Sequence, residues 1–403
     1  MRRIVFAWEL GGGLGHIQYD LPLAKKLQER GHEVICIMKH VIDAEKVFGQ
    51  HGIKVLQAPV WQVQIKKLDN TFSYAETLFN QGYLIKGALL SMTKAWRGLF
   101  DIINPDLLIV DHAPTALIAA RGTNIKVILY GTGFSTPPVK NPIPTIIPWV
   151  KTPKGLLDYS EKKAVDTIND VLKEMKAPLL GSLSDLFAVD ENILATFSEL
   201  DHYQDREKAR YWGPVISLPE GESPRWPGQP DARKIFCYLK PNYPHLEKLL
   251  SCLQKIEASV IIYVKNTPDE IKSKFQSPEM RFVERPLDMN EVCADCHLVI
   301  CHAGHGTIAV ALLHGKPLML LPEHNQLEQI LTSQHVAKLH AGLVILTRQE
   351  KRDYWGGIQR LLSEPRYTEE AKKFARKYKE FDSAKQLEEI ADRCEELMKS
   401  GTG

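Results

Sequence analysis

The chain has 403 residues, with 51 lysines and arginines, 49 aspartates and glutamates, and a formal net charge of +2. A charge so close to zero excludes a surface built to bind nucleic acid, and the length suits two domains of roughly 200 residues each. Seven cysteines, an odd number without framework spacing, indicate free thiols in a reducing compartment. No run approaches the roughly 20 apolar residues of a membrane span, and the chain opens on a strand-like run without a signal peptide. We therefore predict a cytoplasmic protein.

A strand, a glycine-rich turn and a helix are predicted at the start of the chain. Residues 3–8 form an apolar run, residues 11–16 read Gly-Gly-Gly-Leu-Gly-His, and apolar side chains then recur at helical spacing. Because Pro22 cannot lie deep in a helix, we expect the regular helix to begin near Asp20. His16 would then lie at the mouth of the turn, exposed toward the strand ends.

A glycine-rich turn after a strand is also typical of dinucleotide-binding proteins, so this alternative has to be weighed. That fingerprint needs a third small residue where this chain has His16, and an acid closing the second strand where it has Met38 and Lys39. Both requirements fail, which argues against a nicotinamide-dependent enzyme.

Residues 105–111 predict a buried strand that ends on an acid. The run Pro-Asp-Leu-Leu-Ile-Val-Asp places Asp111 at the carboxyl end of the strand, which is the edge where open α/β sheets bind ligands. Asp111 is therefore a candidate functional residue.

A linker is predicted at residues 218–230, because its four prolines and two glycines forbid regular structure. Strand-like runs at residues 234–239 and 259–264 then open a second alternation of strands and helices. Both halves of the chain are thus predicted to be doubly wound α/β domains.

The cysteines and histidines near residue 295 suggest a metal or haem alternative. Cys293, Cys296 and His297 have the spacing of c-type haem attachment, and a zinc site is conceivable because further Cys and His residues follow. Haem attachment of this kind would need an export signal, and residues 298–300 are explained without metal as a short buried strand. The sequence contains no Asp-x-Asp. We predict neither a metal nor a cofactor.

The most informative stretch begins at residue 298 with a short buried strand, followed by His-Ala-Gly-His-Gly-Thr at residues 302–307. Residues 308–314 predict a helix closed by Gly315. Amide groups at a helix start and the positive end of its dipole favour an anion such as a diphosphate.

The side chains of this turn suit the same role. Gly304 and Gly306 let the backbone approach a ligand closely, and Thr307 can cap the helix or offer a hydroxyl. His302 can give a phosphate a further hydrogen bond.

Residues 283–342, together with the first forty residues, resemble the two-domain glycosyltransferases called GT-B, particularly the family that includes macrolide and plant natural-product glycosyltransferases. The resemblance implies two Rossmann-like domains facing across a cleft, with residues 1–215 binding the acceptor and residues 232–385 binding a nucleotide sugar. It also implies that the C-terminal helix, with its end at residues 386–403, crosses back onto the first domain. From its charge pattern, residues 368–399 form one long helical stretch, which a solvated surface helix would fit equally well.

The resemblance also assigns roles to single residues. His16 would be the general base and Asp111 the carboxylate that orients it, in a direct displacement with inversion at the anomeric carbon. The donor diphosphate would be bound by His302, Gly304, His305, Gly306 and Thr307. The donor sugar would be bound by Glu328 and Gln329, with Asn325 and Gln326 as a weaker rival pair because of a two-residue offset.

The acceptor region is less defined. Residues 61–100 mix aromatic and basic side chains, and the segment after Gly131 leads through Phe134 into a proline-rich stretch at residues 136–153. These loops suit a hydrophobic acceptor or a bilayer surface, although apolar side chains at such spacings are more often core. Gly15 and Phe134 are candidate acceptor contacts, and peripheral membrane contact stays open.

Two departures from the family pattern concern the donor. Glu284 replaces a tryptophan that often stacks on the nucleotide base, and Lys240 stands near the family's serine or threonine after the first strand of the second domain. Lys240 is a candidate phosphate contact, with an ordinary surface lysine as the alternative. The nucleotide base and the sugar are therefore left undecided.

The sequence thus predicts an inverting glycosyltransferase that moves a sugar from a nucleotide diphosphate sugar to a hydroxyl of a small apolar or lipid-linked acceptor. No obligate protein partner is evident. The alternatives are a catalytically inactive, nucleotide-binding accessory protein and a same-fold epimerase or hydrolase.

Overall fold

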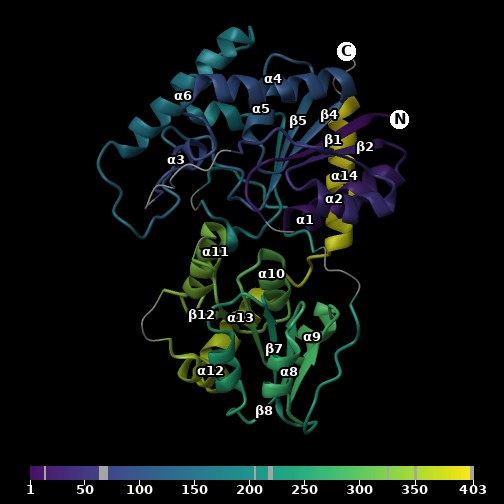
Figure 1. Ribbon diagram of the computed structural model, residues 1–403, viewed down its shortest axis with the longest axis vertical. Coiled ribbons are helices and arrows are strands. Elements are labelled where there is room, and N and C mark those ends of the chain that lie inside the picture. The colour runs from purple at the N-terminus through teal and green to yellow at the C-terminus, as the bar shows by residue number, and fades with distance from the viewer. Residues whose placement is uncertain are drawn as a thin grey trace. The chain divides into compact units, whose positions relative to one another are not determined.

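The computed structural model describes residues 1–12, 15–62, 71–203, 206–216, 221–324, 326–348 and 352–399. The chain forms two compact units (Figure 1). Unit 1 comprises Met1–Val215 together with Asp382–Gly403, and unit 2 comprises Ile216–Phe381.

Unit 1 is built around one parallel sheet. Its strands are β1 (Arg3–Trp8), β2 (Glu33–Met38), β3 (Lys54–Gln57), β4 (Leu107–Val110), β5 (Lys126–Gly131) and β6 (Glu191–Leu194). Its helices are α1 (Gly15–Glu29), α2 (Val41–Phe48), α3 (Tyr74–Phe79), α4 (Lys86–Ile103), α5 (Pro114–Ala120), α6 (Leu156–Glu174) and α14 (Ser383–Lys399), with short 3₁₀ turns η1 (Gly49–His51), η2 (Leu183–Phe187) and η3 (Ser198–Leu200).

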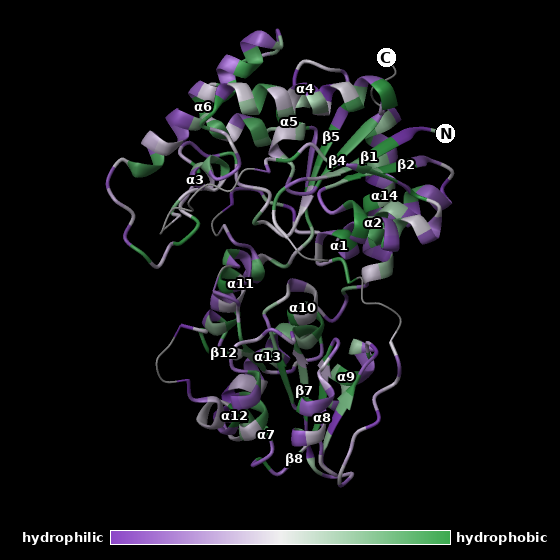
Figure 2. Cartoon of the chain, in the orientation of Figure 1, coloured by the Kyte–Doolittle hydropathy of each residue, from purple (hydrophilic) through white to green (hydrophobic). Residues whose placement is uncertain are grey.

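The strand order in unit 1 is β3-β2-β1-β4-β5-β6, with every neighbouring pair parallel. Parallel strands carry apolar side chains on both faces because helices cover both, and the central strands are green in the hydropathy view (Figure 2). Helices α1, α2 and α14 pack their apolar side chains against one face of the sheet, while α4 and α5 lie on the other side (Figure 1). The order reverses between β1 and β4, which creates a switch point at the carboxyl ends of these two strands.

Unit 2 repeats this architecture. Its strands are β7 (Arg233–Leu239), β8 (Ala258–Val264), β9 (Met280–Val283), β10 (Leu298–Cys301), β11 (Leu318–Leu320) and β12 (Gly342–Val344). Its helices are α7 (Leu246–Leu253), α8 (Asp269–Phe275), α9 (Met289–Asp295), α10 (His305–Leu313), α11 (Leu327–Lys338), α12 (Tyr354–Ser363) and α13 (Pro365–Lys377).

The strand order in unit 2 is β12-β11-β10-β7-β8-β9, again parallel throughout. One face of the sheet is filled by apolar side chains of α7, α8 and α12. The order reverses between β7 and β10, so unit 2 has its switch point after its first and fourth strands, as unit 1 does. The prediction of two doubly wound α/β domains is confirmed.

The C-terminal helix α14 belongs to unit 1. Ile390, Cys394 and Met398 are buried in the same core as α1 and the sheet. At the rim of this contact, Arg30 forms ion pairs with Glu388 (2.5 Å) and with two further acids of α14. Apolar packing and charge pairing therefore fix this helix to unit 1.

The expectation of one helical stretch over residues 368–399 is wrong, because α13 ends at Lys377 and α14 begins at Ser383. The carboxylate of Asp382 accepts hydrogen bonds from the backbone N–H groups of Ala384 (2.9 Å) and Lys385 (3.1 Å). These amides at the start of a helix have no partner within it, so Asp382 supplies the cap that starts a new helix. The chain passes from unit 2 to unit 1 at this residue.

Residues 218–220 of the predicted linker lie outside the described residues, and residues 221–230 contain no helix. Among the residues that the structure describes, no helix combines the length and the apolar character that a membrane span requires.

Candidate active site

His16 and Asp111 meet at the switch point of unit 1. His16 lies in the first turn of α1, directly after β1, and Asp111 follows the last residue of β4. The Nδ1 atom of His16 is 2.5 Å from Oδ2 of Asp111, whose side chain is only 4% exposed. Because a carboxylate accepts hydrogen bonds, this contact places the proton on Nδ1 and leaves Nε2 as the basic nitrogen.

Two further contacts hold the His16 ring in place. Its plane stacks on the indole of Trp8, with ring centroids 4.9 Å apart. On another side it lies against Gly11, where an added Cβ would come within 2.6 Å of Nε2 and where φ is +87°. Only glycine fits both constraints, so the glycine-rich turn shapes the space around the base.

The start of α1 differs from the expectation. The helix begins at Gly15 and continues through Pro22, so His16 is part of its first turn and does not precede the helix. Pro22 removes one hydrogen bond from the helix, but the buried side chains Ile17 and Leu23 pack on either side of it. Tertiary packing therefore carries the helix through the proline.

The residue after Asp111 is held in an uncommon conformation. His112 has φ +48°, and its carbonyl accepts a hydrogen bond from the backbone N–H of Leu10 (3.0 Å). Burial lowers the pKa of the His112 imidazole to about 3, so it is neutral at pH 7. Left-handed backbone at a residue other than glycine is costly and is often found at functional sites.

The candidate acceptor residues lie near this histidine. Phe134 is partly exposed, and its ring packs edge-on against His112 at 5.8 Å between centroids. The His112 ring is in turn 6.5 Å from that of His16. Gly15 is exposed beside His16, and a Cβ added there would meet nothing within 4 Å.

Two buried acids of this site were missed by the sequence reasoning. Asp20 lies one helical turn after His16 and is fully buried, and neither of its carboxyl oxygens has a hydrogen-bond partner among the described residues. Burial, with a smaller contribution from the charge of Asp111, raises its pKa well above the usual value. The signal in the sequence was its place among the apolar positions of the predicted helix.

Glu9 is the second buried acid and follows β1 directly. Its carboxyl group accepts hydrogen bonds from the indole N–H of Trp96 (2.9 Å) and the backbone N–H of Thr115 (2.8 Å). It thereby joins the end of β1, which leads into the glycine-rich turn before His16, to α4 and α5. Burial raises the pKa of Glu9 to about 7.

In unit 2, the predicted diphosphate-binding turn lies at the switch point between β7 and β10. Helix α10 begins at His305, three residues earlier than expected, with Gly304 as its N-cap. His305, Gly306 and Thr307 therefore form the first turn, whose amides have no acceptor within a helix. A Cβ added at Gly304 or Gly306 would meet nothing within 4 Å, so the space above the turn is open to an anion.

His302 makes two hydrogen bonds within the protein. Its Nδ1–H donates to the carbonyl of Leu321 (2.8 Å), and its Nε2 accepts the backbone N–H of Lys240 (3.0 Å). Burial lowers the pKa of the ring, which is therefore neutral. His302 thus joins the carboxyl ends of β7, β10 and β11 with both ring nitrogens occupied. The predicted hydrogen bond from His302 to a donor phosphate would require one of these two bonds to break.

The predicted sugar-binding pair lies on the first turn of α11. The side-chain oxygen of Gln329 accepts the backbone N–H of Glu323 (3.0 Å), while Glu328 is partly exposed. Of the rival pair, Asn325 lies outside the described residues and Gln326 is the residue that precedes α11.

The cysteines with the spacing of c-type haem attachment, Cys293 and Cys296, are buried in the protein. Both are free thiols, and Nδ1 of His297 accepts the backbone N–H of Lys234 (3.1 Å). Within the described parts of the chain, no three His, Cys, Asp or Glu residues are grouped so that they could hold a metal ion.

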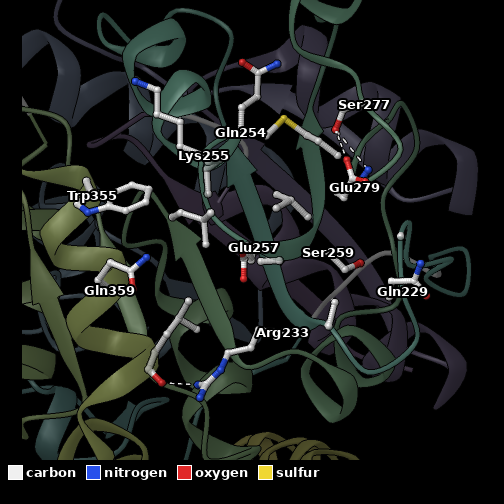
Figure 3. Close-up of a pocket in the computed structure, with 18 of the residues that line it drawn as sticks. Gln229, Arg233, Gln254, Lys255, Glu257, Ser259, Ser277, Glu279, Trp355 and Gln359 are labelled. Atoms are coloured by element: carbon white, nitrogen blue, oxygen red, sulfur yellow. Dashed lines mark hydrogen bonds between the residues drawn. The ribbon is translucent and has the colours of Figure 1, made fainter.

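A surface hollow of about 930 Å³ lies at the amino ends of the strands of the second sheet, away from the carboxyl ends that carry the predicted diphosphate site (Figure 3). It is lined by residues at the amino ends of β7, β8 and β9, including Arg233, Ser259 and Glu279. Parallel α/β sheets bind ligands at the carboxyl ends of their strands, so this hollow is not the candidate site.

A known family model matches part of the chain. Residues 245–389 match the model of the glycosyltransferase family 28 C-terminal domain. Comparison with curated proteins gives no significant match.

Three solved structures illustrate the structural likeness. The calicheamicin glycosyltransferase CalG4 is 18% identical, with a TM-score of 0.72 over 100% of this chain and 99% of its own. The glycosyltransferase VinC, in complex with dTDP, is 16% identical, with a TM-score of 0.67 over 97% and 100%. The spinosyn rhamnosyltransferase SpnG, complexed with spinosyn aglycone, is 17% identical, with a TM-score of 0.66 over 97% and 100%.

Both chains are thus covered almost completely in each comparison, and the fold is GT-B. Together with the matched domain, this classes the protein as a glycosyltransferase of GT-B type, as the sequence motifs predicted.

Proposed function

We propose that the protein is an inverting glycosyltransferase that transfers a sugar from a nucleoside diphosphate sugar to a hydroxyl group of a small apolar or lipid-linked acceptor. The observation that carries the proposal is the contact between His16 and Asp111 at the switch point of unit 1. A histidine oriented by a buried carboxylate is a general base suited to remove the proton of an acceptor hydroxyl.

In the proposed reaction, Nε2 of His16 takes the proton while the acceptor oxygen attacks the anomeric carbon of the donor. The bond from that carbon to the diphosphate oxygen breaks as the new bond forms, which inverts the configuration. The nucleoside diphosphate leaves with the electron pair, and Asp111 stabilises the imidazolium ion. Such a base contributes about 10²–10⁴-fold in rate, and the rest comes from alignment and from stabilising the leaving group.

The first turn of α10 supports the assignment of the donor. Backbone amides in the first turn of a helix and the positive end of the helix dipole stabilise phosphate groups, and the glycines leave room for one above the turn. VinC, which shares the fold, was solved with dTDP. We therefore place the diphosphate at this turn and the donor sugar near Glu328 and Gln329.

The acceptor is assigned by the character of the surface near His16. Phe134 offers an apolar face two rings away from the base, on the far side of His112. SpnG, also of this fold, was solved with an aglycone. These features favour an apolar acceptor, either a small molecule or a lipid-linked one.

The proposal is tested in two steps. A thermal-shift panel of UDP, TDP, GDP, ADP and NAD selects the nucleotide, since a ligand at 100 times its dissociation constant stabilises a protein by about 2.7 kcal/mol. Donor turnover is then measured for the parental protein and for His16→Ala and Asp111→Asn, with His51→Ala as the control histidine in the same unit. We expect both active-site variants to bind the nucleotide normally and to lose about 10²–10⁴-fold in rate.

Parental turnover in His16→Ala would show that this residue is not the base. A product with retained anomeric configuration would contradict direct displacement. Nucleotide binding without turnover would favour an inactive accessory protein, and turnover without an acceptor would favour an epimerase or a hydrolase.

A further inference from the structure

An ion pair lies beside the predicted diphosphate site. Lys240 is the first residue after β7, and Glu323 follows β11 by three residues. Strand β10 lies between β7 and β11 in the sheet. The ion pair between the Lys240 ammonium and the Glu323 carboxylate therefore spans the carboxyl end of β10, where the chain turns into α10.

Both partners are fixed at the backbone by residues of the same site. The N–H of Lys240 donates to Nε2 of His302, and the N–H of Glu323 donates to the side-chain oxygen of Gln329, each at 3.0 Å. The charged ends are more exposed, with 48% of the Lys240 side chain and 23% of the Glu323 side chain accessible. The backbone is thus held in place while the charges can exchange partners with solvent or a ligand.

The strength of the pair is suited to such an exchange. Exposed ion pairs contribute little to stability, because water screens them and both side chains lose freedom. A diphosphate carries more negative charge than one carboxylate, and its charge increases as the bond to the sugar breaks. An ammonium ion is a common ligand of phosphate groups, so a diphosphate at the first turn of α10 can displace Glu323.

We propose that Lys240 is the cation that neutralises the donor diphosphate, and that Glu323 is its counter-ion in the ligand-free protein. When the donor binds, the Lys240 ammonium group leaves its ion pair with Glu323 and forms one with the diphosphate. Glu323 then acts against binding, because its carboxylate competes for Lys240 and repels the anion. This inference rests on the proposed function and adds to it the residue that receives the charge of the leaving group.

The test is a double-mutant cycle read by calorimetric titration with the nucleoside diphosphate that stabilises the parental protein. The variants are Lys240→Met, Glu323→Gln and the double substitution. Lys274→Met is the matched control, because it removes an ion pair with Glu247 (2.5 Å) elsewhere in unit 2. The nucleoside without phosphates serves as the control ligand.

The proposal gives the two substitutions effects of opposite sign. Lys240→Met should weaken diphosphate binding at least tenfold, whereas Glu323→Gln should tighten it severalfold. In the double variant the gain from Glu323→Gln should shrink, because no ammonium remains to be released and only the relief of charge repulsion is left. Lys240→Arg should recover part of the affinity, and binding of the free nucleoside should not respond to either substitution.

Diphosphate binding that Lys240→Met leaves unchanged, or that Glu323→Gln weakens, overturns this inference and leaves the proposed function standing. Absence of nucleoside diphosphate binding by the parental protein overturns the proposed function, and this inference with it.

Discussion

Glu9→Gln tests the burial of the carboxyl group that joins β1 to α4 and α5, through the pH dependence of stability. Burial raises the pKa of Glu9 from 4.5 to about 7. Between these values the folded protein keeps a proton on Glu9 that the unfolded chain has already lost. The free energy of unfolding therefore falls as pH rises through this window. At 1.36 kcal/mol per pKa unit, the loss amounts to about 3 kcal/mol.

The glutamine variant has no carboxyl group to titrate at this position. Its free energy of unfolding, taken relative to the parental protein, should therefore rise by about 3 kcal/mol between pH 4 and pH 8. A constant cost is added at every pH, because the amide N–H₂ faces one of the donors Trp96 and Thr115 and leaves that hydrogen bond unmade. That cost is about 1–3 kcal/mol and carries no pH dependence.

The measurement is urea unfolding at one-unit steps from pH 4 to pH 8, followed by tryptophan fluorescence. Glu45→Gln is the control, because this glutamate of α2 is exposed and should differ from the parental protein by a constant amount. A difference between Glu9→Gln and the parental protein that stays within about 0.5 kcal/mol across the window would refute the reasoning.

Two further substitutions probe unit 1. Asp20→Asn should gain stability relative to the parental protein as pH rises above about 4, by up to about 1.4 kcal/mol per pH unit. The reason is that the raised pKa of Asp20 keeps this side chain protonated in the folded state at a pH where the unfolded chain has lost the proton. A difference in the free energy of unfolding that does not change with pH, measured by urea unfolding, would contradict this. Ile390→Ala should cost about 2–5 kcal/mol, since this residue of α14 is fully buried in the core of unit 1. A loss below 1 kcal/mol in the same measurement would show that α14 contributes little to that core.

The fold was predictable because its signals are local and repeated. Apolar runs of strand length alternate with helical periodicity in both halves, and this alternation specifies parallel sheets covered by helices. The two glycine-bearing turns, before His16 and after His302, were predicted from strand and helix patterns on either side. Both turns lie where the sheet order reverses.

Helix boundaries were less predictable because packing and caps outweigh the local pattern. Pro22 predicts a helix start near Asp20, but the buried residues around it continue the helix through it. The break before α14 depends on the capping carboxylate of Asp382. The charge pattern around Asp382 gives no sign of the break, because acids and bases recur at helical spacing on both sides.

The partners of the site residues could not be read from the sequence, because they join residues far apart in the chain. The bond from Lys240 to His302 spans 62 positions, and the ion pair from Lys240 to Glu323 spans 83. Such contacts follow from strand order, which a sequence pattern does not give. For the same reason the sequence gives no sign that Glu9 joins β1 to α4 and α5, because its partners Trp96 and Thr115 are far away in the chain.

The two sheets share one strand order, and in each unit the proposed functional side chains follow the first and the fourth strand. The charged groups at these positions are of opposite sign in the two units. In unit 1 the residues after the first and fourth strands supply the proposed base and its carboxylate, and in unit 2 they supply an ammonium group and the proposed anion-binding turn. In both units the backbone turns left-handed just after the fourth strand, at His112 (φ +48°) and at Ala303 (φ +57°). Each turn follows the residue that bridges the switch point, Asp111 in one unit and His302 in the other. Because strain is retained where the surrounding structure requires it, the repeated geometry indicates that both switch points are built to hold a side chain in a fixed direction.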